Sequence, residues 1–355
     1  MNEVEGYIFN GFRYYSTYKN DALPLVEHDK IGPEYLYKYY PLFDYHVESL
    51  VNSHFYASHP FELNDILDSS LFLFFASQPI EFNVYEKFYD RKGKTAFDTK
   101  EELRDFYNKD TINGCTDYIF HVYGILSYKF GIISLSENEN DPLMWPHYTQ
   151  EKGFQIKFNS QLLADSIQKG LPNNGGYVGL FPMNYTERLE PIDISKFRGI
   201  KIPFIYSTNV KLDKWKYENE WRFIVSKPKM GVPSSKLGFS VLEDHDFNPR
   251  FRYINYGIES VESICLGMNF FPGRDFSVQK KSEMEYEVEP KQGENFCMYI
   301  KLLDFFIDSF KEKIFLSVVK KERDKDGTIF LKRSKERVEI ERIGLAKYKI
   351  LRTVS

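Results

Sequence analysis

The chain has 355 residues, of which 42% are hydrophobic and 28% are charged, and this balance is typical of a globular protein. Its 47 basic and 51 acidic side chains give a net charge of −4. That value excludes a surface that is basic throughout, so nucleic acid is not indicated as a partner, although a local patch is compatible with it. The sequence opens without a signal-peptide pattern and contains no run of ~18 apolar residues, so we expect a cytoplasmic protein without a membrane partner.

Strand and helix patterns alternate along the first part of the chain. Residues 1–33 are polar, and we expect a loosely ordered extension there. The alternating aromatic residues at 34–40 predict a strand, residues 45–52 have helical spacing, and residues 54–58 predict a second strand. From about residue 67 to about residue 128 the chain has longer runs of helical period, which predict a helical insertion.

The second part of the chain predicts more strands than helices. Residues after Pro272 are charged and predict a loop, residues 295–314 have the apolar spacing of one helix, and Asp326-Gly327 lies between two alternating runs, as in a β-hairpin. We therefore expect a single α+β domain over residues 34–355, with a mixed or antiparallel sheet, a helical insertion, and a C-terminal helix plus hairpin. The expected strands lie at 131–136, 153–159, 181–186, 220–226 and 260–268.

The densest cluster of charged residues lies at 214–223, with the sequence KWKYENEWRF. Glu218 and Glu220 are two residues apart, so on a strand both carboxylates point to one face, which Arg222 continues. Such a row is costly to bury unless its members pair or bind a substrate. The alternative is an ordinary surface ladder of Glu and Arg, but the neighbouring Trp215 favours a buried cleft.

Two other polar clusters are candidates for the same cleft. Asn64, Asp65 and Asp68 follow a predicted strand, where either Asn64 or Asp65 caps a helix or the three side chains form a polar wall. Trp145, His147 and Tyr148 crowd one turn at the end of another strand, a common position for ligand contacts. His147 can exchange a proton near neutral pH, and its alternative role is that of a hydrogen-bonded core histidine.

Several common catalytic motifs are missing from the sequence. The seven histidines have neither the HExxH nor the HxH spacing, and the three cysteines are widely separated, so no metal is expected. No phosphate-binding P-loop, GxGxxG fingerprint or GxSxG nucleophile elbow occurs either. These absences argue against a Walker ATPase, a Rossmann dehydrogenase and a serine hydrolase.

The chain resembles a bacterial family of unknown function, domain of unknown function 2971. The resemblance extends from about Glu34 to Gly267 and depends on the order of short segments rather than on any one of them. The family implies no established reaction. The segments are YLYKYY, FYASHPFELNDILD, ISLSENENDPLMWPHY, GFQIKF, KWKYENEWRF and SICLGM.

A weaker similarity is to the motif order of mono-ADP-ribosyltransferases, whose third motif is a Glu-x-Glu on a strand. This resemblance implies that Glu220 polarises the ribose of NAD and that Glu218 helps to place the nucleophile. The carboxylate would stabilise the positive charge that develops as nicotinamide leaves. NAD would then be the substrate, and no metal would be needed.

The same resemblance implies roles for residues on the first two strands. Lys38 would hold a phosphate or ribose of the dinucleotide, and Tyr56 with Ser58 would take the second motif position. Tyr37 would stack on the nicotinamide or adenine, although strand packing explains such a tyrosine equally well. Lys38 is a departure, because these enzymes have Arg or His at the first motif.

Three functions follow as hypotheses. The first is an NAD-consuming, ADP-ribosyltransferase-like enzyme, for which the resemblance implies a role as a toxin or in defence against phage. The second is a non-catalytic module that binds a nucleotide or a partner protein. The third is a magnesium-dependent nucleic-acid enzyme with Asp65, Asp68 and Glu220 as ligands and the basic C-terminal stretch on phosphates. The acceptor or partner macromolecule is not identified by the sequence.

Overall fold

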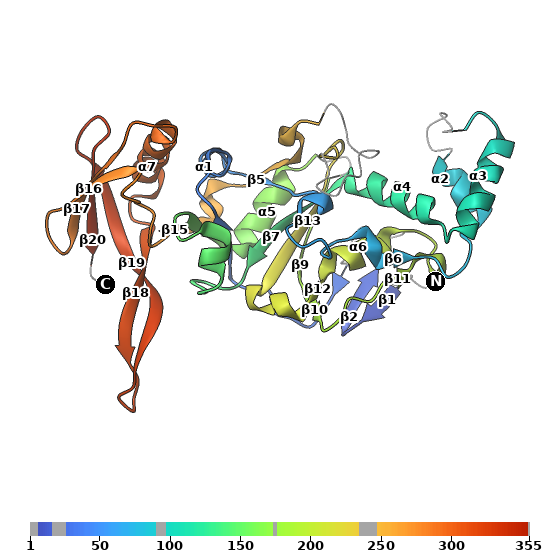
Figure 1. Cartoon of the computed structure of the whole chain (residues 1–355), viewed down its shortest axis with the longest axis horizontal. Coiled ribbons are helices and arrows are strands. Elements are labelled where there is room, and N and C mark those ends of the chain that lie inside the picture. The colour runs from blue at the N-terminus through green and yellow to red at the C-terminus, as the bar shows by residue number, and fades with distance from the viewer. Residues whose placement is uncertain (1–5, 16–25, 90–96, 173–175, 234–246, 354–355) are drawn as a thin grey trace.

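One 11-stranded sheet runs through the molecule, as the computed structural model of residues 6–15, 26–89, 97–172, 176–233 and 247–353 shows (Figure 1). Neighbouring strands in it are antiparallel except β15 and β18, which are parallel. The predicted α+β class with a mixed sheet is confirmed. In spatial order the strands are β16 (Phe276–Lys280), β17 (Glu285–Pro290), β20 (Tyr348–Thr353), β19 (Ile329–Arg342), β18 (Ile314–Arg323), β15 (Val261–Leu266), β8 (Phe154–Asn159), β4 (Tyr35–Tyr40), β7 (Phe130–Ser136), β13 (Glu220–Ser226) and β9 (Tyr177–Pro182).

Some of the helices pack on this sheet, and three helices lie within the predicted helical insertion. These three are α2, α3 and α4, and a capping box in which Thr99 and Glu102 bond each other's backbone starts α3. The part of the insertion at 90–96 lies outside the described residues. None of the described helices is long and apolar enough to cross a membrane. The α-helices are α1 (Asp44–Val51), α2 (Phe82–Tyr89), α3 (Lys100–Ile112), α4 (Thr116–Ser127), α5 (Ser160–Gly170), α6 (Lys201–Asn209) and α7 (Phe296–Phe310).

The start of the chain is more ordered than its polar composition predicts. Strands β1 (Gly6–Phe9), β2 (Phe12–Tyr15) and β3 (Val26–Glu27) form a three-stranded antiparallel sheet. Tyr14 is fully buried, and its hydroxyl donates to the side-chain oxygen of Asn209 at 3.0 Å. Aromatic residues among the polar ones give this segment a core-facing side, so it packs against α6. Residues 1–5 and 16–25 lie outside the described residues.

Two large hydrophobic clusters lie on opposite faces of β13. Strand residues alternate between faces, so Trp221, Phe223 and Val225 enter one cluster and Ile224 enters the other. The first cluster is continuous with α7 and the C-terminal strands. Because both faces of β13 are covered, its polar residues are buried as well.

The C-terminal part of the chain forms the end of the sheet, with α7 on one side of it (Figure 1). The predicted helix is confirmed as α7, and the predicted hairpin is β18 and β19, with Gly327 at a φ of +91° in the turn. The predicted loop after Pro272 is wrong, because β16 and β17 form an antiparallel hairpin there. Strand β16 is exposed after Phe276 and β17 is mostly half-buried, so neither strand has a clear apolar pattern.

Shorter strands connect the remaining segments. One short pair joins residues 54–56 to residues 253–255, and another places Lys211 beside residues 184–186. The predicted turn of helix near Pro146 is present as one π-helical turn, Trp145–Thr149. The short strands are β5 (His54–Tyr56) with β14 (Tyr253–Asn255), β6 (Phe74–Phe75) with β11 (Ile192–Asp193), and β10 (Asn184–Thr186) with β12 (Val210–Leu212).

Candidate functional site

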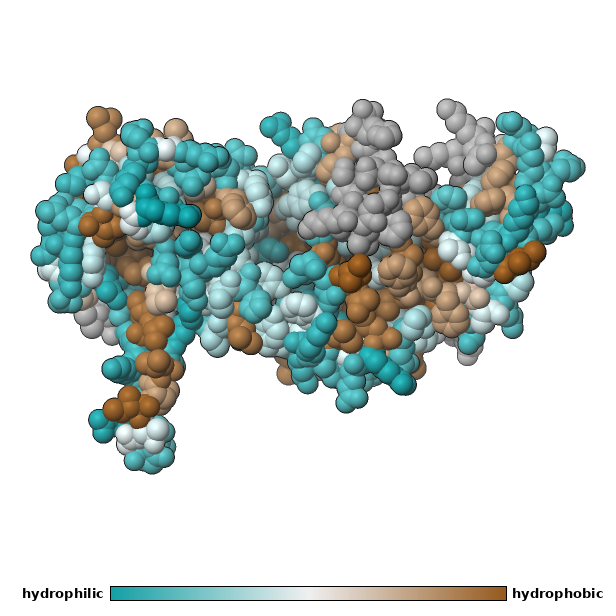
Figure 2. All heavy atoms as spheres, in the orientation of Figure 1, coloured by the Kyte–Doolittle hydropathy of each residue, from teal (hydrophilic) through white to brown (hydrophobic). Residues whose placement is uncertain are grey.

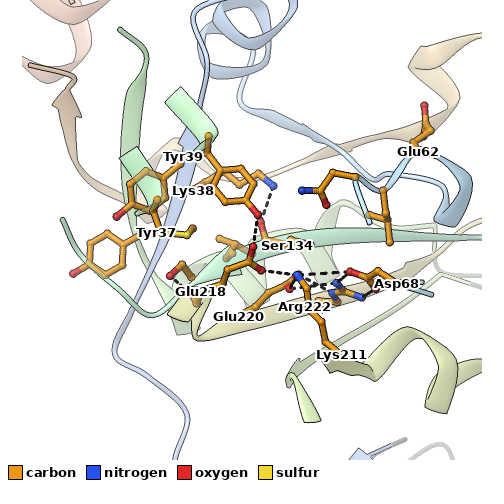
Figure 3. Close-up of a pocket in the computed structure, with 16 residues that line it drawn as sticks. Tyr37, Lys38, Tyr39, Glu62, Asp68, Ser134, Lys211, Glu218, Glu220 and Arg222 are labelled. Atoms are coloured by element: carbon orange, nitrogen blue, oxygen red, sulfur yellow. Dashed lines mark hydrogen bonds and ion pairs between the residues drawn. The ribbon is translucent and has the colours of Figure 1, made fainter. Parts of the chain in front are cut away.

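A pocket of about 170 Å³ opens beside the middle strands β4, β7 and β13 (Figure 3). In the described sheet β4 and β7 share a single residue pair, Tyr37 with Ser136, and side chains from both strands line the pocket. Ligand clefts usually measure ~300–1,000 Å³, so this pocket suits a small polar group or one end of a larger ligand. Its lining includes Tyr37, Lys38, Asn64, Asp68, Ser134, Ser136, Tyr148, Lys211, Glu218, Glu220 and Arg222.

Buried ion pairs form the floor of this pocket (Figure 3). Arg222 donates to both oxygens of Asp68 at 2.8 and 2.5 Å, and its Nε donates to Glu220 Oε1 at 2.7 Å. Lys211 Nζ donates to Glu218 Oε2 at 2.5 Å and to Glu220 Oε2 at 2.8 Å. These five side chains are between 1 and 5% exposed. Three carboxylates and two cations therefore share a site from which water is largely excluded.

The pKa values of Glu218 and Glu220 shift in opposite directions although both carboxylates contact Lys211. Burial opposes ionisation of Glu220, but Arg222 and Lys211 together hold its pKa far below the usual range. Burial raises the pKa of Glu218, and the adjacent charge of Glu220 adds to this shift, while Lys211 opposes it. Glu218 also accepts a short hydrogen bond from the hydroxyl of Tyr148. The pocket thus separates two carboxylates into a firmly ionised one and one that binds a proton more readily.

The two glutamates converge by a different route from the predicted one. Glu220 begins β13, but Glu218 ends a 3-10 helix, Asp213–Glu218, rather than lying on the same strand. Asn219 between them has a φ of +42°, in the left-handed region, so the chain turns sharply there. The prediction that one strand face aligns both carboxylates is therefore wrong. For Arg222 it is right, because the alternation of β13 does place it beside Glu220.

Lys38 lies at the side of the pocket between β4 and β7. Its Nζ donates to the main-chain oxygen of Ser134 at 2.6 Å. Burial lowers the pKa of Lys38 to about 8; Glu220 opposes this shift and Arg222 adds to it. Lys38 is therefore a cation that can lose its proton in mildly alkaline solution, at a position open to a ligand.

Tyrosines surround the charged floor. Tyr37 lines the pocket and belongs to a cluster that includes Met144 and Trp145. The hydroxyl of Tyr185 accepts the main-chain N–H of Glu220 at 2.9 Å and so fixes the start of β13. Burial raises the pKa of both Tyr148 and Tyr185, and the nearby carboxylates raise it further. Both hydroxyls therefore remain protonated and act as hydrogen-bonding groups.

Several predicted site residues lie outside the pocket lining. Tyr56 donates to Glu62 at 2.7 Å, and Ser58 forms a backbone bridge with Ile132. Trp215 donates from its ring nitrogen to Asp65 at 2.7 Å. The hydrogen bond between Trp215 and Asp65 links the segment before β13 to the segment that contains Asp68. Asp65 and Trp215 are both half-buried, and the ring centre of Trp215 lies 5.2 Å from Nζ of Lys211 in the charged floor.

The predicted cluster in the π-helical turn is divided by the structure. Only Tyr148 lines the pocket. Trp145 is fully buried and meets Tyr39 edge to face, with ring centroids 5.5 Å apart. His147 is exposed, and its ring lies 6.2 Å from that of Tyr217. The turn therefore contributes one polar group to the pocket and one packing group to its wall, while His147 faces outward.

The pocket also includes Lys211, Ser136 and Asp68, and the ADP-ribosyltransferase resemblance assigns a role to none of them. Lys211 reaches the glutamates because β12 pairs with β10, an arrangement that no local pattern indicates. Ser136 donates to the main-chain oxygen of Glu218 at 2.5 Å. Asp68 has the clearest local signal, since it shares the NDILD segment with Asn64, which does line the pocket. Its pairing with Arg222 spans more than 150 positions in sequence.

The third hypothesis required carboxylates that are available to a metal ion. In the part of the chain that the structure describes, no group of three or more His, Cys, Asp and Glu side chains is placed to hold one. Asp68 and Glu220 are bound instead to Arg222 and Lys211, and Asp65 accepts a hydrogen bond from Trp215. The donor set therefore does not fit the expected magnesium site.

These features define an α+β protein with one large mixed sheet and a pocket built on buried ion pairs. Residues 144–223 match the model of a family described as Protein of unknown function (DUF2971). The predicted family is confirmed on this segment, which is less than a quarter of the chain and includes most of the charged floor. No curated protein and no solved structure matches the chain. The similarity to ADP-ribosyltransferases stays a prediction.

Proposed function

We propose that the pocket cleaves the N-glycosidic bond of NAD, either in ADP-ribosyl transfer or in hydrolysis. The observation that carries this proposal is the pair of carboxylates whose environments shift their pKa values in opposite directions. Such a pair supplies an ionised group for a developing positive charge and a second group that exchanges a proton. Both border a pocket large enough for the reacting end of a dinucleotide.

Each group has a defined part in the proposed step. The bond between ribose C1′ and nicotinamide N1 breaks, and its electron pair leaves with nicotinamide, which departs as a neutral molecule. Glu220 stabilises the oxocarbenium-like charge on the ribose. The oxygen or nitrogen of the acceptor forms the new bond to C1′, and its proton passes to Glu218. Lys38 contacts the anionic part of the ligand.

The test is release of nicotinamide from NAD, measured by chromatography with cell extract as the source of acceptors. Glu220→Gln should lower the rate by at least about a hundredfold, because it removes the charge but keeps the shape. Glu289→Gln, at an exposed position on β17, is the matched control and should keep the wild-type rate. Circular dichroism of each variant establishes that it is folded.

A second candidate function follows because every carboxylate of the charged floor already pairs with a cation. Asp68, Glu218 and Glu220 all have cationic partners without any ligand, as in a rigid binding surface. A non-catalytic module that binds a nucleotide or a protein would therefore keep its ligand affinity in Glu220→Gln. Intact NAD in the presence of folded wild-type protein and acceptors would contradict the first function and favour this one.

A further inference from the structure

The hairpin of β18 and β19 extends well beyond the sheet (Figure 1). β15 pairs with β18 only over Ile314–Leu316, and β20 pairs with β19 only over Arg337–Arg342. Between these joints and the turn, the two strands pair only with each other in the described structure. We call this outer part, residues 317–336, the arm. The arm therefore extends past the residues that pair with the rest of the sheet.

The register of the arm assigns its residues to two faces. Pairs such as Val319 with Arg333 and Arg323 with Ile329 continue without a bulge, so odd-numbered residues of both strands share one face and even-numbered residues share the other. We call these the odd face and the even face. The odd face carries Val319, Lys321, Arg323, Ile329, Leu331, Arg333 and Lys335, together with Ser317.

The even face balances its own charges. Lys332 pairs with Glu322 at 3.2 Å, and Lys320 pairs with Glu336 at 2.9 Å. Each cation of these pairs has an acid on the neighbouring strand. This face therefore has no unmatched charge from these groups and needs no partner to neutralise it.

The odd face contains four cations and no acidic residue. At its base, Arg333 binds both oxygens of Glu151 and Lys335 binds Glu139, and these acids lie in the loops beside the pocket. Farther out, neither Lys321 nor Arg323 forms an ion pair with any described residue. Arg333 and Lys335 are thus neutralised by acidic side chains, whereas Lys321 and Arg323 are not.

Aliphatic side chains lie between these cations. Val319, Ile329 and Leu331 are 46, 59 and 69% exposed, and hydrophobic residues are visible along the projecting arm in Figure 2. Lysine on a free strand edge commonly prevents aggregation, but that role does not explain three exposed aliphatic residues on the same face. On this face each of the three aliphatic residues lies opposite a cation of the other strand, and exposed apolar groups beside charged ones are typical of a protein interface.

The odd face also continues into the wall of the pocket. The guanidinium of Arg333 lies 5.6 Å from the ring centre of Trp145. Trp145 belongs to the cluster of Tyr37 and Met144, both of which line the pocket. The base of the odd face therefore contacts the hydrophobic cluster that borders the pocket.

We propose that the odd face of the arm is a docking surface for an acidic protein segment that also presents aliphatic side chains. Its carboxylates would pair with Lys321 and Arg323, and its aliphatic groups would cover Val319, Ile329 and Leu331. A two-stranded ribbon can also enter a nucleic-acid groove, but a phosphate backbone offers nothing to cover the aliphatic residues. The inference goes beyond the proposed NAD reaction and holds for a binding module as well.

The experiment measures binding of fluorescent probes by anisotropy to the full chain. The probes are a peptide of alternating Glu and Leu, a peptide of alternating Glu and Gly, and a short DNA duplex. Lys321→Gln with Arg323→Gln removes two charges from the odd face, and Lys320→Gln with Lys332→Gln removes two from the even face. Ile329→Ser with Leu331→Ser removes the two most exposed of the three aliphatic residues.

The proposal expects the Glu-Leu peptide to bind more tightly than the Glu-Gly peptide. Both odd-face variants should weaken its binding by at least about tenfold, while the even-face variant stays near wild type. Equal losses in the two charge variants would overturn the assignment to the odd face. Absence of peptide binding, or tighter binding of the duplex with loss in the charge variants alone, would overturn the protein partner. Nicotinamide release from NAD, with cell extract as the source of acceptors and without the peptide probes, serves as a separate measurement, so failure of either proposal is distinguishable.

Discussion

At the scale of single residues, Arg222 determines whether the pocket floor can exist. It is buried, and it neutralises Asp68 on one side and Glu220 on the other. Removing one partner of a buried ion pair leaves an uncompensated charge in a region of low polarity. The ion pairs thus make the pocket rigid, and each member depends on the others.

We expect Arg222→Met to lower the free energy of unfolding by about 3–5 kcal/mol, because two buried carboxylates lose one of their two cations and keep only Lys211. Urea denaturation measures the change. Arg274→Met is the matched control, since Arg274 is 70% exposed and pairs with Asp275 at the surface; its effect should stay within about 0.5 kcal/mol. Equal destabilisation by the two substitutions would contradict the role of the buried network.

Lys38 gives the pocket a pH dependence. With a pKa of about 8, it is charged below that pH and loses its charge as the pH rises. If it binds the phosphates of NAD, affinity should fall about tenfold between about pH 7 and about pH 9, where roughly a tenth of Lys38 is protonated. Calorimetric titration with NAD measures this. Lys38→Arg keeps its charge over the range and should remove the loss, whereas an unchanged pH dependence in this variant would assign the effect to another group.

At the scale of elements, the junction between the π-helical turn and β8 depends on Gly153. A Cβ at this position would lie 1.9 Å from the main-chain oxygen of Tyr40, on the neighbouring strand β4. Gly153 also accepts a hydrogen bond from the N–H of Gly267 at 2.8 Å. Close contact of three backbone segments therefore joins Tyr148 of the pocket to the middle of the sheet.

We expect Gly153→Ala to lower the free energy of unfolding by more than about 2 kcal/mol, because β4 and β8 must separate to admit the methyl group. Thermal and urea unfolding measure the effect. Gly273→Ala offers a comparison, since a Cβ there meets nothing within 4 Å, and its stability should be nearly unchanged. A stable Gly153→Ala variant would show that the junction can open.

Element prediction from the sequence succeeded where local pattern and environment agree. β13 has the predicted bounds, and α7 follows its apolar spacing. Helix α6 had no such signal, because its residues from Ile202 to Asn209 are all buried and it has no polar face. For the pocket, Glu218, Glu220 and Arg222 could be found as a local cluster. Lys211 could not, since only strand pairing brings it there.

At the scale of the whole molecule, the arm has little part in holding the fold together. Beyond Arg333 its ion pairs lie within the hairpin itself, as in Lys332 with Glu322. The joints to β15 and β20 lie closer to the sheet. Stability should therefore be insensitive to the outer arm.

We expect replacement of residues 321–331 by Asn-Gly, a favoured two-residue hairpin turn between the facing Lys320 and Lys332, to change the melting temperature by no more than about 2 °C. Release of nicotinamide from NAD should be retained while binding of the acidic peptide is lost. Differential scanning calorimetry together with the anisotropy assay measures both. A large fall in melting temperature would mean that the arm supports the fold after all.

The first hydrophobic cluster unites the two ends of the molecule. It includes residues of β13 beside the pocket and residues of α7 and β19 below the arm, and α1 packs on α7 between them. Because the two ends share this core, unfolding one end while the other stays folded costs free energy. Thermodynamic linkage then follows, because a partner that binds only the folded arm raises the stability of the whole molecule. A partner bound to the arm would therefore slow proteolytic cleavage of the segments around the pocket, which lie on the far side of the same core.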